Sequence, residues 1–323
     1  MRYPLFLVRQ LCRTVSKKVV RSGARHLPFL PKARTRRLER WLRGREDWRK
    51  LRFADAVVVS FGKSGRTWLR VLLSRVFQLQ HGLDERAILG FDNLHYRTGA
   101  VPKILFTHDN YLRDYTGRRD SKADFYHKMV IFLARDPRDV AVSQYFQWKY
   151  RMKPNKKDIN AYPMDDLAPF DFVMSDAGLP KVIQFMNLWA KEAPKIKDFM
   201  VVRYEDLRAR PEETLQRLLE FLGAPATETQ IAEAVAFASY DNMKQMEQQR
   251  VFWLSGGRLV PKDRSNPNSY KVRRGRVAGY RDGFDAVQLA RIDQLVETTL
   301  DPLYGYIRAS PRTGGDKALE GAA

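Results

Sequence analysis

The sequence predicts an α/β fold in which a central parallel β-sheet lies between two layers of helices. Four short apolar runs have the composition of buried strands, at residues 57–59, 103–107, 129–134 and 200–204. The stretches between these runs carry apolar residues at helical spacing. Strands that alternate with helices favour parallel pairing, so we expect three layers, α/β/α. The 323 residues suffice for one large domain of this kind or two smaller ones.

Composition indicates a chain with a real core and no disulfides. Hydrophobic residues make up 44% of the sequence, and the single cysteine, Cys12, excludes an intrachain disulfide. No apolar run is long enough to span a bilayer. The apolar run Leu5–Val8 ends at Arg9 and is too short for the core of a signal peptide. These features predict a soluble, cytoplasmic protein.

Positive charge is concentrated in the first residues of the chain. Residues 1–52 hold 17 Lys and Arg against three acids, a local net charge of +14 out of the total of +21. Apolar residues recur there at helical spacing, so residues 1–50 are predicted to be a basic amphipathic helical arm. Three interpretations stay open: an arm on a membrane surface, a helix packed on the main domain, or an organelle transit peptide.

The chain is expected to consist of the basic arm, a main domain and a tail. Pro28, Pro31 and the basic residues 34–37 have the character of a connector between the arm and the rest. We expect a main domain at residues 51–308. A disordered, glycine-containing tail is expected at residues 309–323.

The first strand leads into a loop with the character of an anion site. Val57–Val59 is followed by the glycine-containing turn Phe61–Gly65 and then by a helix. The N–H groups at the start of that helix and the charge of Lys63 would meet at one point, which suits a phosphate or a sulfate ester. The loop is not a Walker A motif, because Val57 occupies the place of its first glycine. The alternative is an ordinary turn with a solvated lysine.

Two further strands end in polar residues at the same expected edge of the sheet. His108 closes the strand at 103–107, and Arg135 closes the strand at 129–134. Asp136 is predicted to cap a following helix that carries Ser143. Parallel strands bring their carboxyl ends to one crevice, where Arg135 and Ser143 could hold a second anionic group. Alternatively, Arg135 pairs with a neighbouring aspartate, and His108 and Ser143 are structural.

Two loops complete the predicted site. Residues 151–180 contain four prolines with lysines and aromatic residues between them, and we interpret them as an irregular lid over an acceptor site. Residues 251–282 include a dense basic segment interrupted by glycines. Glycines permit close backbone approach, which favours a phosphate clamp over a solvated charged face or a nucleic-acid surface. Between the two loops, a helix is expected to end at Gly223.

Taken together, these motifs resemble the sulfotransferases that use 3′-phosphoadenosine 5′-phosphosulfate (PAPS), namely the cytosolic type and its bacterial relatives. The resemblance spans residues 55–285. Residues 61–68 resemble the family's 5′-phosphosulfate loop and residues 134–143 its 3′-phosphate segment. Thr107-His108 resembles its catalytic Thr-His pair, and two short motifs follow in the family's order: Tyr204-Glu205-Asp206 and Arg273-Arg274-Gly275. The family implies a P-loop-like three-layer α/β/α fold with a central parallel sheet.

The resemblance implies a role for each matching residue. Lys63 would contact the transferring sulfuryl group, and His108 would be the general base. The 5′-phosphate would be held by Ser64, Gly65, Arg66 and Thr67. Aromatic residues would flank the adenine, namely Trp68, Tyr204 and Tyr240. The 3′-phosphate would be held by Arg135, Ser143, Arg273, Arg274 and Gly275.

Three positions depart from the family pattern. Phe106 occupies the place where the family often has a lysine, which puts a second cation at the acceptor hydroxyl in doubt. Arg66 replaces a common threonine in the first loop. Residues 281–287 keep only the outline of the family's dimer motif, so no oligomeric state is predicted.

The expected function is in-line transfer of a sulfuryl group from PAPS to a hydroxyl acceptor. The aromatic and cationic loops favour a carbohydrate or glycolipid over a small alcohol or phenol. No metal motif is present in the sequence, and none is needed by a phosphate leaving group. Two rival classes remain: a P-loop kinase or NTPase, and a charge-driven binder of nucleic acid or membrane. We expect no nucleic-acid partner.

Overall fold

Four parallel strands form the centre of the computed structural model, which describes residues 23, 31–252, 259–272 and 275–307. The strands are β1 (Ala56–Val59), β2 (Ile104–Thr107), β3 (Met129–Ala134) and β4 (Asp198–Arg203). Their order across the sheet is β2-β1-β3-β4, and every adjacent pair is parallel. The predicted fold class and all four predicted strands are therefore confirmed.

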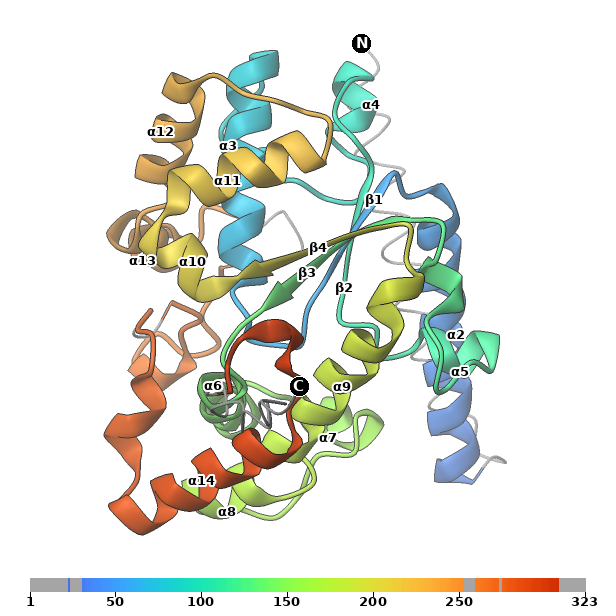
Figure 1. Cartoon of the computed structure of the whole chain (residues 1–323), viewed down its shortest axis with the longest axis vertical. Coiled ribbons are helices and arrows are strands. Elements are labelled where there is room, and N and C mark those ends of the chain that lie inside the picture. Colours follow the sequence, from blue (N-terminus) through green and yellow to red (C-terminus); the bar gives the residue numbers. More distant parts are fainter. Residues whose placement is uncertain (1–22, 24–30, 253–258, 273–274, 308–323) are drawn as a thin grey trace, which may run out of the picture.

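The alternation of side chains along β1 explains the three layers. Val57 and Val59 point into a core shared with one set of helices, whereas Val58 points into a second core on the opposite face. All three valines are fully buried, which accounts for the continuous apolar run in the sequence. Figure 1 shows the two sets of helices on either side of the sheet.

The helices divide between these two faces. The first core is covered by α6 (Pro137–Tyr150), α9 (Leu179–Glu192) and α14 (Ala286–Thr299). The second core is covered by α3 (Arg66–His81), α11 (Pro211–Phe221) and α12 (Glu228–Phe237). The shorter helical elements are α4 (His95–Thr98), α10 (Tyr204–Ala209), η1 (Ala123–Phe125), η2 (Ala193–Lys195), η3 (Pro267–Ser269), η4 (Gly279–Gly283) and η5 (Pro302–Tyr304).

The second half of the basic arm is a long helix, α2 (Lys32–Phe53). The expected connector at residues 34–37 is therefore wrong, because the helix begins directly after Pro31 and its arginines are good helix formers. The expected boundary after residue 50 also lies inside α2. Residues 1–22 and 24–30 of the predicted arm lie outside the described residues, as does the predicted tail.

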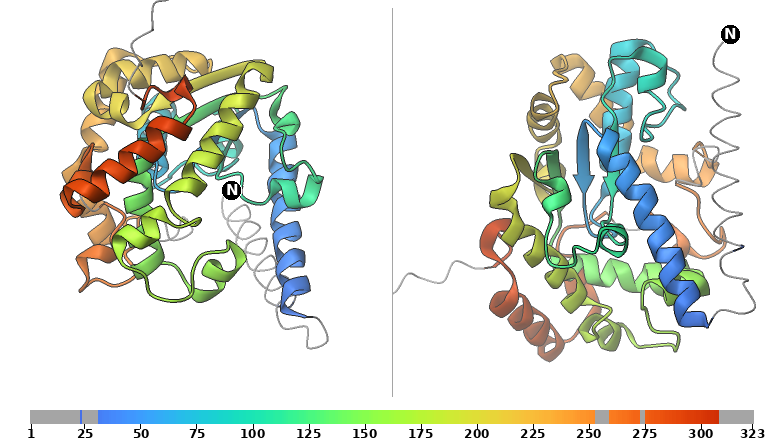
Figure 2. Two further views of the ribbon diagram at one scale, coloured as in Figure 1. Left: turned by 60° about the horizontal axis from the view of Figure 1, so that its bottom comes forward. Right: turned by 90° about the vertical axis from the view of Figure 1, so that its right-hand side faces the viewer.

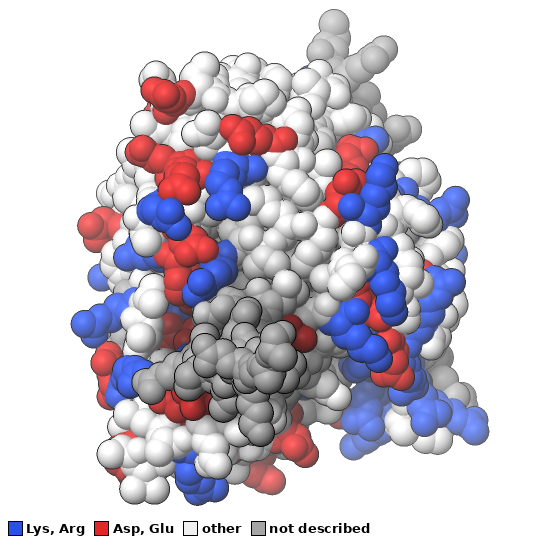
Figure 3. All heavy atoms as spheres, in the orientation of Figure 1, with Lys and Arg blue, Asp and Glu red and all other residues white. Residues whose placement is uncertain are grey.

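Helix α2 packs along α5 (Leu112–Thr116), as both views of Figure 2 show. Gly44 permits this contact, since a Cβ atom there would collide with the carbonyl oxygen of Tyr111. Lys and Arg side chains gather on the right-hand side of Figure 3, where Figure 1 places α2. Within the described part of the chain, no helix is long and apolar enough to cross a membrane.

Several helices were missed by the sequence prediction. The expected irregular lid at 151–180 contains α7 (Pro154–Ile159) and α8 (Pro169–Met174), and in each helix a proline occupies the first turn. Helix α13 (Tyr240–Gln249) was also not predicted. Its sequence is mostly polar, with only Tyr240, Met243 and Met246 at helical spacing, and Ser239 caps it by accepting a hydrogen bond from the N–H of Asn242.

Candidate active site

The carboxyl ends of the four strands open into one cavity of about 1510 Å³. Each strand delivers a polar or aromatic residue to this end of the sheet: Ser60 after β1, His108 after β2, Arg135 after β3 and Tyr204 after β4. This is the crevice in which open parallel sheets bind ligands.

Most of the predicted site residues line this cavity. They are Lys63, Gly65, Arg66, Thr67, Trp68, His108, Arg135, Ser143, Tyr204, Tyr240 and Gly275. Ser64 does not line it: its side chain is buried under the loop, and the residue has 2% of its surface exposed. Arg273 and Arg274 lie outside the described residues.

The loop between β1 and α3 has the backbone shape of an anion cradle. Lys63 and Gly65 both have left-handed backbone conformations, with φ of 80° and 93°. Helix α3 begins at Arg66, so the N–H groups of its first turn face the same loop as Lys63. A Cβ atom at position 65 would lie 2.6 Å from the Tyr204 ring, which explains the glycine.

Lys63 lies in a concentration of positive charge. Burial, followed by the charges of Arg151, Arg135 and Lys271 in that order, lowers the pKa of its ammonium group to about 7. Glu247 opposes this effect but accepts hydrogen bonds from the N–H groups of Lys271 and Val272. Cations that destabilise one another in this way are stabilised by a bound anion.

Arg151 is a site residue that sequence reasoning missed. It follows the last turn of α6 and lines the cavity. Its Nε and Nη1 atoms are buried and have no hydrogen-bond partner among the described residues. Burial lowers the pKa of this guanidinium. No pattern in the sequence pointed to it, because an arginine at the end of an amphipathic helix is ordinarily solvated.

Arg135 is held in place by its neighbours rather than left free. Its guanidinium donates to the carbonyl oxygens of Lys63 and Arg276, both at 3.1 Å, and lies 4.4 Å from the centre of the Tyr204 ring. The ion pair with Asp139, considered as an alternative, is present at 3.5 Å. Asp139 also accepts hydrogen bonds from the N–H groups of Ala278 and Tyr280, within the predicted phosphate clamp of residues 251–282, here called the basic loop. Arg135 thus joins the first loop to the basic loop.

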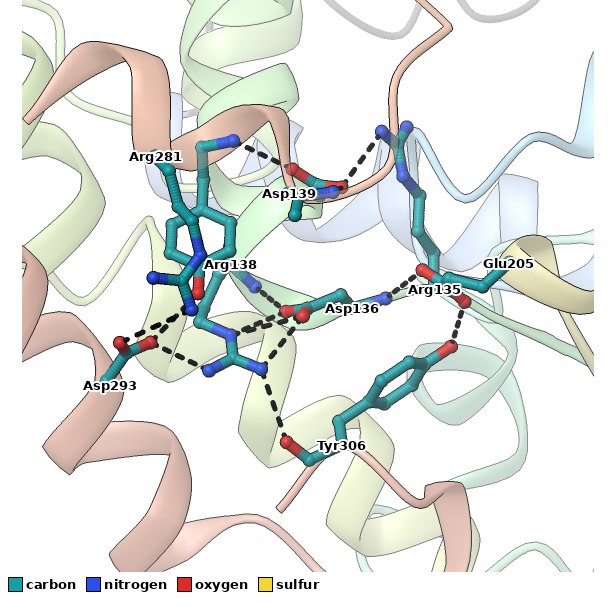
Figure 4. A network of polar contacts seen from close by, with 10 residues as sticks. Arg135, Asp136, Arg138, Asp139, Glu205, Arg281, Asp293 and Tyr306 are labelled. Atoms are coloured by element: carbon teal, nitrogen blue, oxygen red, sulfur yellow. Dashed lines mark hydrogen bonds and ion pairs between the residues drawn. The ribbon is translucent and has the colours of Figure 1, made fainter. Parts of the chain in front are cut away.

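A polar network behind Arg135 fixes the turn that follows β3 (Figure 4). Asp136 caps α6 as predicted and forms an ion pair with Arg138, which also binds Asp293 of α14. The N–H of Asp136 donates to Glu205, whose other oxygen accepts from the hydroxyl of Tyr306 at 2.6 Å. Glu205 therefore has a structural role in the Tyr204-Glu205-Asp206 motif.

Three aromatic residues line the same end of the cavity. Trp68 and Tyr204 meet edge to face with ring centres 5.7 Å apart, and the indole N–H of Trp68 donates to the carbonyl oxygen of Ala238. Gly275 has φ of 61°, and a Cβ atom there would lie 2.9 Å from the Tyr240 ring. The backbone of the basic loop thus approaches the aromatic residues closely.

The tautomer of His108 follows from its contact with the main chain. Nδ1 lies 2.8 Å from the carbonyl oxygen of Ser60, which can only accept a hydrogen bond. Nδ1 therefore carries the proton, and Nε2 has a free lone pair. Burial, followed by the charge of Arg66, lowers the pKa of the imidazole to about 3. The neutral ring can accept a proton at Nε2.

Positive charge near His108 comes from α3 instead of from position 106. The guanidinium of Arg70 lies 3.8 Å from the ring centre of Phe106. The charges of Arg66 and Arg70 both act on His108. Although position 106 is a phenylalanine and not a lysine, the charges of Arg66 and Arg70 still act on the histidine.

A buried ion pair lies directly after His108 in the chain. Asp109, in a left-handed conformation, forms an ion pair of 2.6 Å with Lys122, and the ammonium group of Lys122 lies over the Trp189 ring. Both partners are almost fully buried. Nothing in the sequence connected these two residues, because twelve residues that include α5 separate them.

The described residues contain no group of three or more His, Cys, Asp or Glu side chains that could hold a metal ion. The groups that face the cavity include cations, backbone N–H groups and the neutral imidazole of His108. These groups suit the binding and transfer of an anionic group.

A comparison with protein families identifies the domain. The sulfotransferase domain family matches residues 122–303, more than half of the chain. The chain belongs to this family. The enzyme class expected from the sequence motifs is thereby confirmed.

Individual relatives cover most of the chain. Cytosolic sulfotransferase 13 of Arabidopsis thaliana is 25% identical over 272 residues, which are 79% of this chain and 78% of that protein. Sulfotransferase 6B1 of Danio rerio is 23% identical over 274 residues and covers 80% of each chain. The crystal structure of mouse sulfotransferase SULT7A1 complexed with PAP matches with a TM-score of 0.52 and 20% identity. It covers 79% of this chain and 89% of that one, and it shows that the fold is shared.

Proposed function

We propose that this protein transfers a sulfuryl group from PAPS to a hydroxyl acceptor, with His108 as the general base. The observation that carries the proposal is that Lys63, the start of α3 and the free Nε2 of His108 meet in one cavity. A solved relative of the same fold is in complex with 3′-phosphoadenosine 5′-phosphate (PAP), and the cations of this cavity suit such an anionic nucleotide.

The donor would occupy the end of the cavity that contains the β1–α3 loop. We assign the 5′-phosphate to the loop residues Gly65, Arg66 and Thr67, with Ser64 contributing its backbone N–H, since its side chain is buried. The adenine would lie among Trp68, Tyr204 and Tyr240. The 3′-phosphate would be held by Arg135, Ser143, Arg273, Arg274 and Gly275.

The reaction follows from these positions. The acceptor hydroxyl would give its proton to Nε2 of His108 as its oxygen bonds to sulfur. The bond between sulfur and the bridging oxygen of the 5′-phosphate would break at the same time. The leaving nucleotide is 3′-phosphoadenosine 5′-phosphate (PAP), and Lys63 with the N-terminus of α3 would stabilise its new negative charge. Placement and charge stabilisation are what such a transfer requires.

Among hydroxyl acceptors we favour a carbohydrate or a glycolipid. The support is the polar part of the cavity lining, where Asn110 and Gln184 offer hydrogen bonds. A small alcohol or phenol is the alternative. We place the enzyme in the cytoplasm, in keeping with the names of its cytosolic relatives, and leave contact of the basic arm with a membrane as a further proposal.

We propose that the main domain comprises α2 together with the expected residues 51–308, because the expected boundary falls inside this helix. Arg36 and Arg40 of α2 line the cavity, which supports the inclusion of this helix in the working enzyme. The family match between residues 122 and 303 lies within the proposed domain.

The test is transfer of ³⁵S label from PAPS to a panel of sugars, glycolipids, alcohols and phenols. We expect His108→Ala and Lys63→Met each to reduce transfer at least about 100-fold, in the range usual for an acid–base group or an electrostatic contact. His108→Ala should still bind PAP. His127→Ala is the matched control, since His127 is exposed and does not line the cavity. Full activity of His108→Ala would show that the base has been assigned wrongly.

A further inference from the structure

One part of the cavity is lined by residues outside the predicted donor site and has its own charged groups; we call it the acceptor half. This acceptor half is bounded by α2, α5, the segment after α7 and the first turns of α9. Lys181, in the first turn of α9, points into it: its ammonium group donates to the carbonyl oxygen of Asn160 at 2.7 Å and lies 4.2 Å from the centre of the Tyr162 ring. Lys181 is half-buried, and its three N–H groups make one hydrogen bond to the residues that the structure describes.

Three of the four carboxylates of the acceptor half already have partners. Asp114 accepts two hydrogen bonds from the guanidinium of Arg40, at 3.1 and 2.8 Å. Asp158 pairs with Arg36 at 3.0 Å, and Asp109 pairs with Lys122 at 2.6 Å. The fourth, Asp120, is exposed at the rim beside Arg119.

Cations without a carboxylate partner remain in this half. Within the described part of the chain, neither Lys181 nor Arg113 forms an ion pair. Burial, followed by the nearby charges of Arg40 and Arg113, lowers the pKa of Lys181 to about 8. Arg40 is paired with Asp114, whereas Lys181 has no carboxylate partner of its own among the described residues. A half-buried ammonium group in such surroundings is stabilised by an incoming anion.

Hydrogen bonds of Arg40 connect the surroundings of Lys181 with the segment that follows His108. Arg40, which is near enough to act on Lys181, donates to the carbonyl oxygen of Asn110, two residues after His108. Arg40 also donates to the carbonyl oxygen of Ile159, next to the Asn160 that binds Lys181. Because Lys181 and His108 line the same cavity, we expect one acceptor molecule to contact both.

We propose that the acceptor carries an anionic group, such as a carboxylate, in addition to the hydroxyl that is sulfated. Lys181 binds this group directly, and Arg113 adds charge at the rim of the site. The substrate class is thus a hydroxy acid, which includes sugars that bear an acidic group. This inference rests on the proposed function, and it concerns the half of the cavity that the donor does not occupy.

The test compares acids with their uncharged derivatives. A panel of hydroxyl compounds, including hydroxyaryl acids and uronic acid glycosides, is offered as matched pairs of free acid and methyl ester to the enzyme saturated with PAP. Binding is measured by ligand-observed NMR, and sulfation of the binders is measured with labelled PAPS. We expect acids to bind at least tenfold more tightly than their esters. Lys181→Met should reduce this preference about 10- to 100-fold, the usual effect of one charge-assisted hydrogen bond.

Two variants separate a local contact from a general effect of charge. Lys181→Arg should keep most of the preference for acids. Lys197→Met removes the same unit of charge at an exposed position outside the cavity and should leave the preference unchanged. Equal binding of acids and esters, or no binding of any acid, would overturn the proposal. So would an acid preference that survives in Lys181→Met.

Failure of this proposal is distinguishable from failure of the proposed function. An enzyme that binds PAP and sulfates only the esters or neutral sugars has the proposed function but not the anionic acceptor. An enzyme that does not bind PAP at all lacks the function on which the inference rests.

Discussion

Nδ1 of His108 lies 2.8 Å from the carbonyl oxygen of Ser60, so the end of β1 determines which nitrogen of the histidine faces the cavity. We predict that His108 is neutral, with its proton on Nδ1, throughout the range from about pH 5 to about pH 8 in the free enzyme. The reason is that its pKa is lowered to about 3, so protonation requires a far more acidic solution.

The measurement is an NMR titration of the ¹⁵N-labelled imidazole, assigned with His108→Gln. His127, which is exposed, provides the comparison within the same spectra. A His108 that takes up a proton near the ordinary histidine pKa of about 6.5 would contradict the prediction, since burial and the charge of Arg66 would then not govern it.

Binding of PAP is predicted to be coupled to proton uptake by Lys63. Its pKa of about 7 in the free enzyme means that much of it is neutral one pH unit higher, and a bound anion raises that pKa. The affinity for PAP should therefore be highest below a pH of about 7 and fall as the pH rises above that value.

Calorimetry at about pH 8 in two buffers with different ionisation enthalpies measures this uptake directly. We expect a proton uptake close to one per site, reduced to nearly zero in Lys63→Met. Lys244→Met, on the exposed face of α13, should behave like the parent protein. Affinity that stays constant from slightly acidic to clearly alkaline pH would argue against a perturbed Lys63.

Gly65→Ala should damage both stability and the donor site. The residue has a left-handed backbone, and the new Cβ atom would lie 2.6 Å from the Tyr204 ring. The backbone penalty alone is about 1–2 kcal/mol, and displacement of Tyr204 should in addition weaken PAP binding at least tenfold.

Gly82→Ala is the matched control. Gly82 also has positive φ, but nothing lies within 4 Å of the position that a Cβ atom would take there. It should show the backbone penalty in urea unfolding and bind PAP normally. Equal PAP affinity in the two variants would show that the position of the Tyr204 ring does not depend on a glycine at position 65.

Glu205→Gln tests the network of Figure 4. Glu205 accepts from the N–H of Asp136 and from the hydroxyl of Tyr306, so loss of its charge should cost about 1–3 kcal/mol of unfolding free energy. Asp206→Asn changes the neighbouring carboxylate, which lies outside this network, and should cost less than about 1 kcal/mol. Equal unfolding midpoints for both variants would show that the network does not stabilise the turn.

Residues at strand ends could be predicted from the sequence because local patterns determine them. The apolar run before His108 and the run before Arg135 placed both residues at the same edge of a parallel sheet. Asp136 followed by proline identified the start of α6 correctly.

Other site residues depend on partners that are distant in the chain. Lys181 contacts Asn160 and lies near Arg40, and Glu205 binds Tyr306, which is 101 residues away. No periodicity or spacing connects such pairs. Helix α13 was missed for another reason, since its stability comes from a cap and a few buried contacts instead of a continuous apolar face.

The most direct test of the proposed function is calorimetric titration of the whole chain with PAP in the presence of EDTA. We predict one tight site per chain, weakened at least tenfold by Arg135→Ala, because Arg135 lies between the first loop and the basic loop. Arg217→Ala, exposed on α11, should bind like the parent protein. No binding of PAP, together with binding of ATP that requires magnesium, would contradict the account and favour a kinase or NTPase.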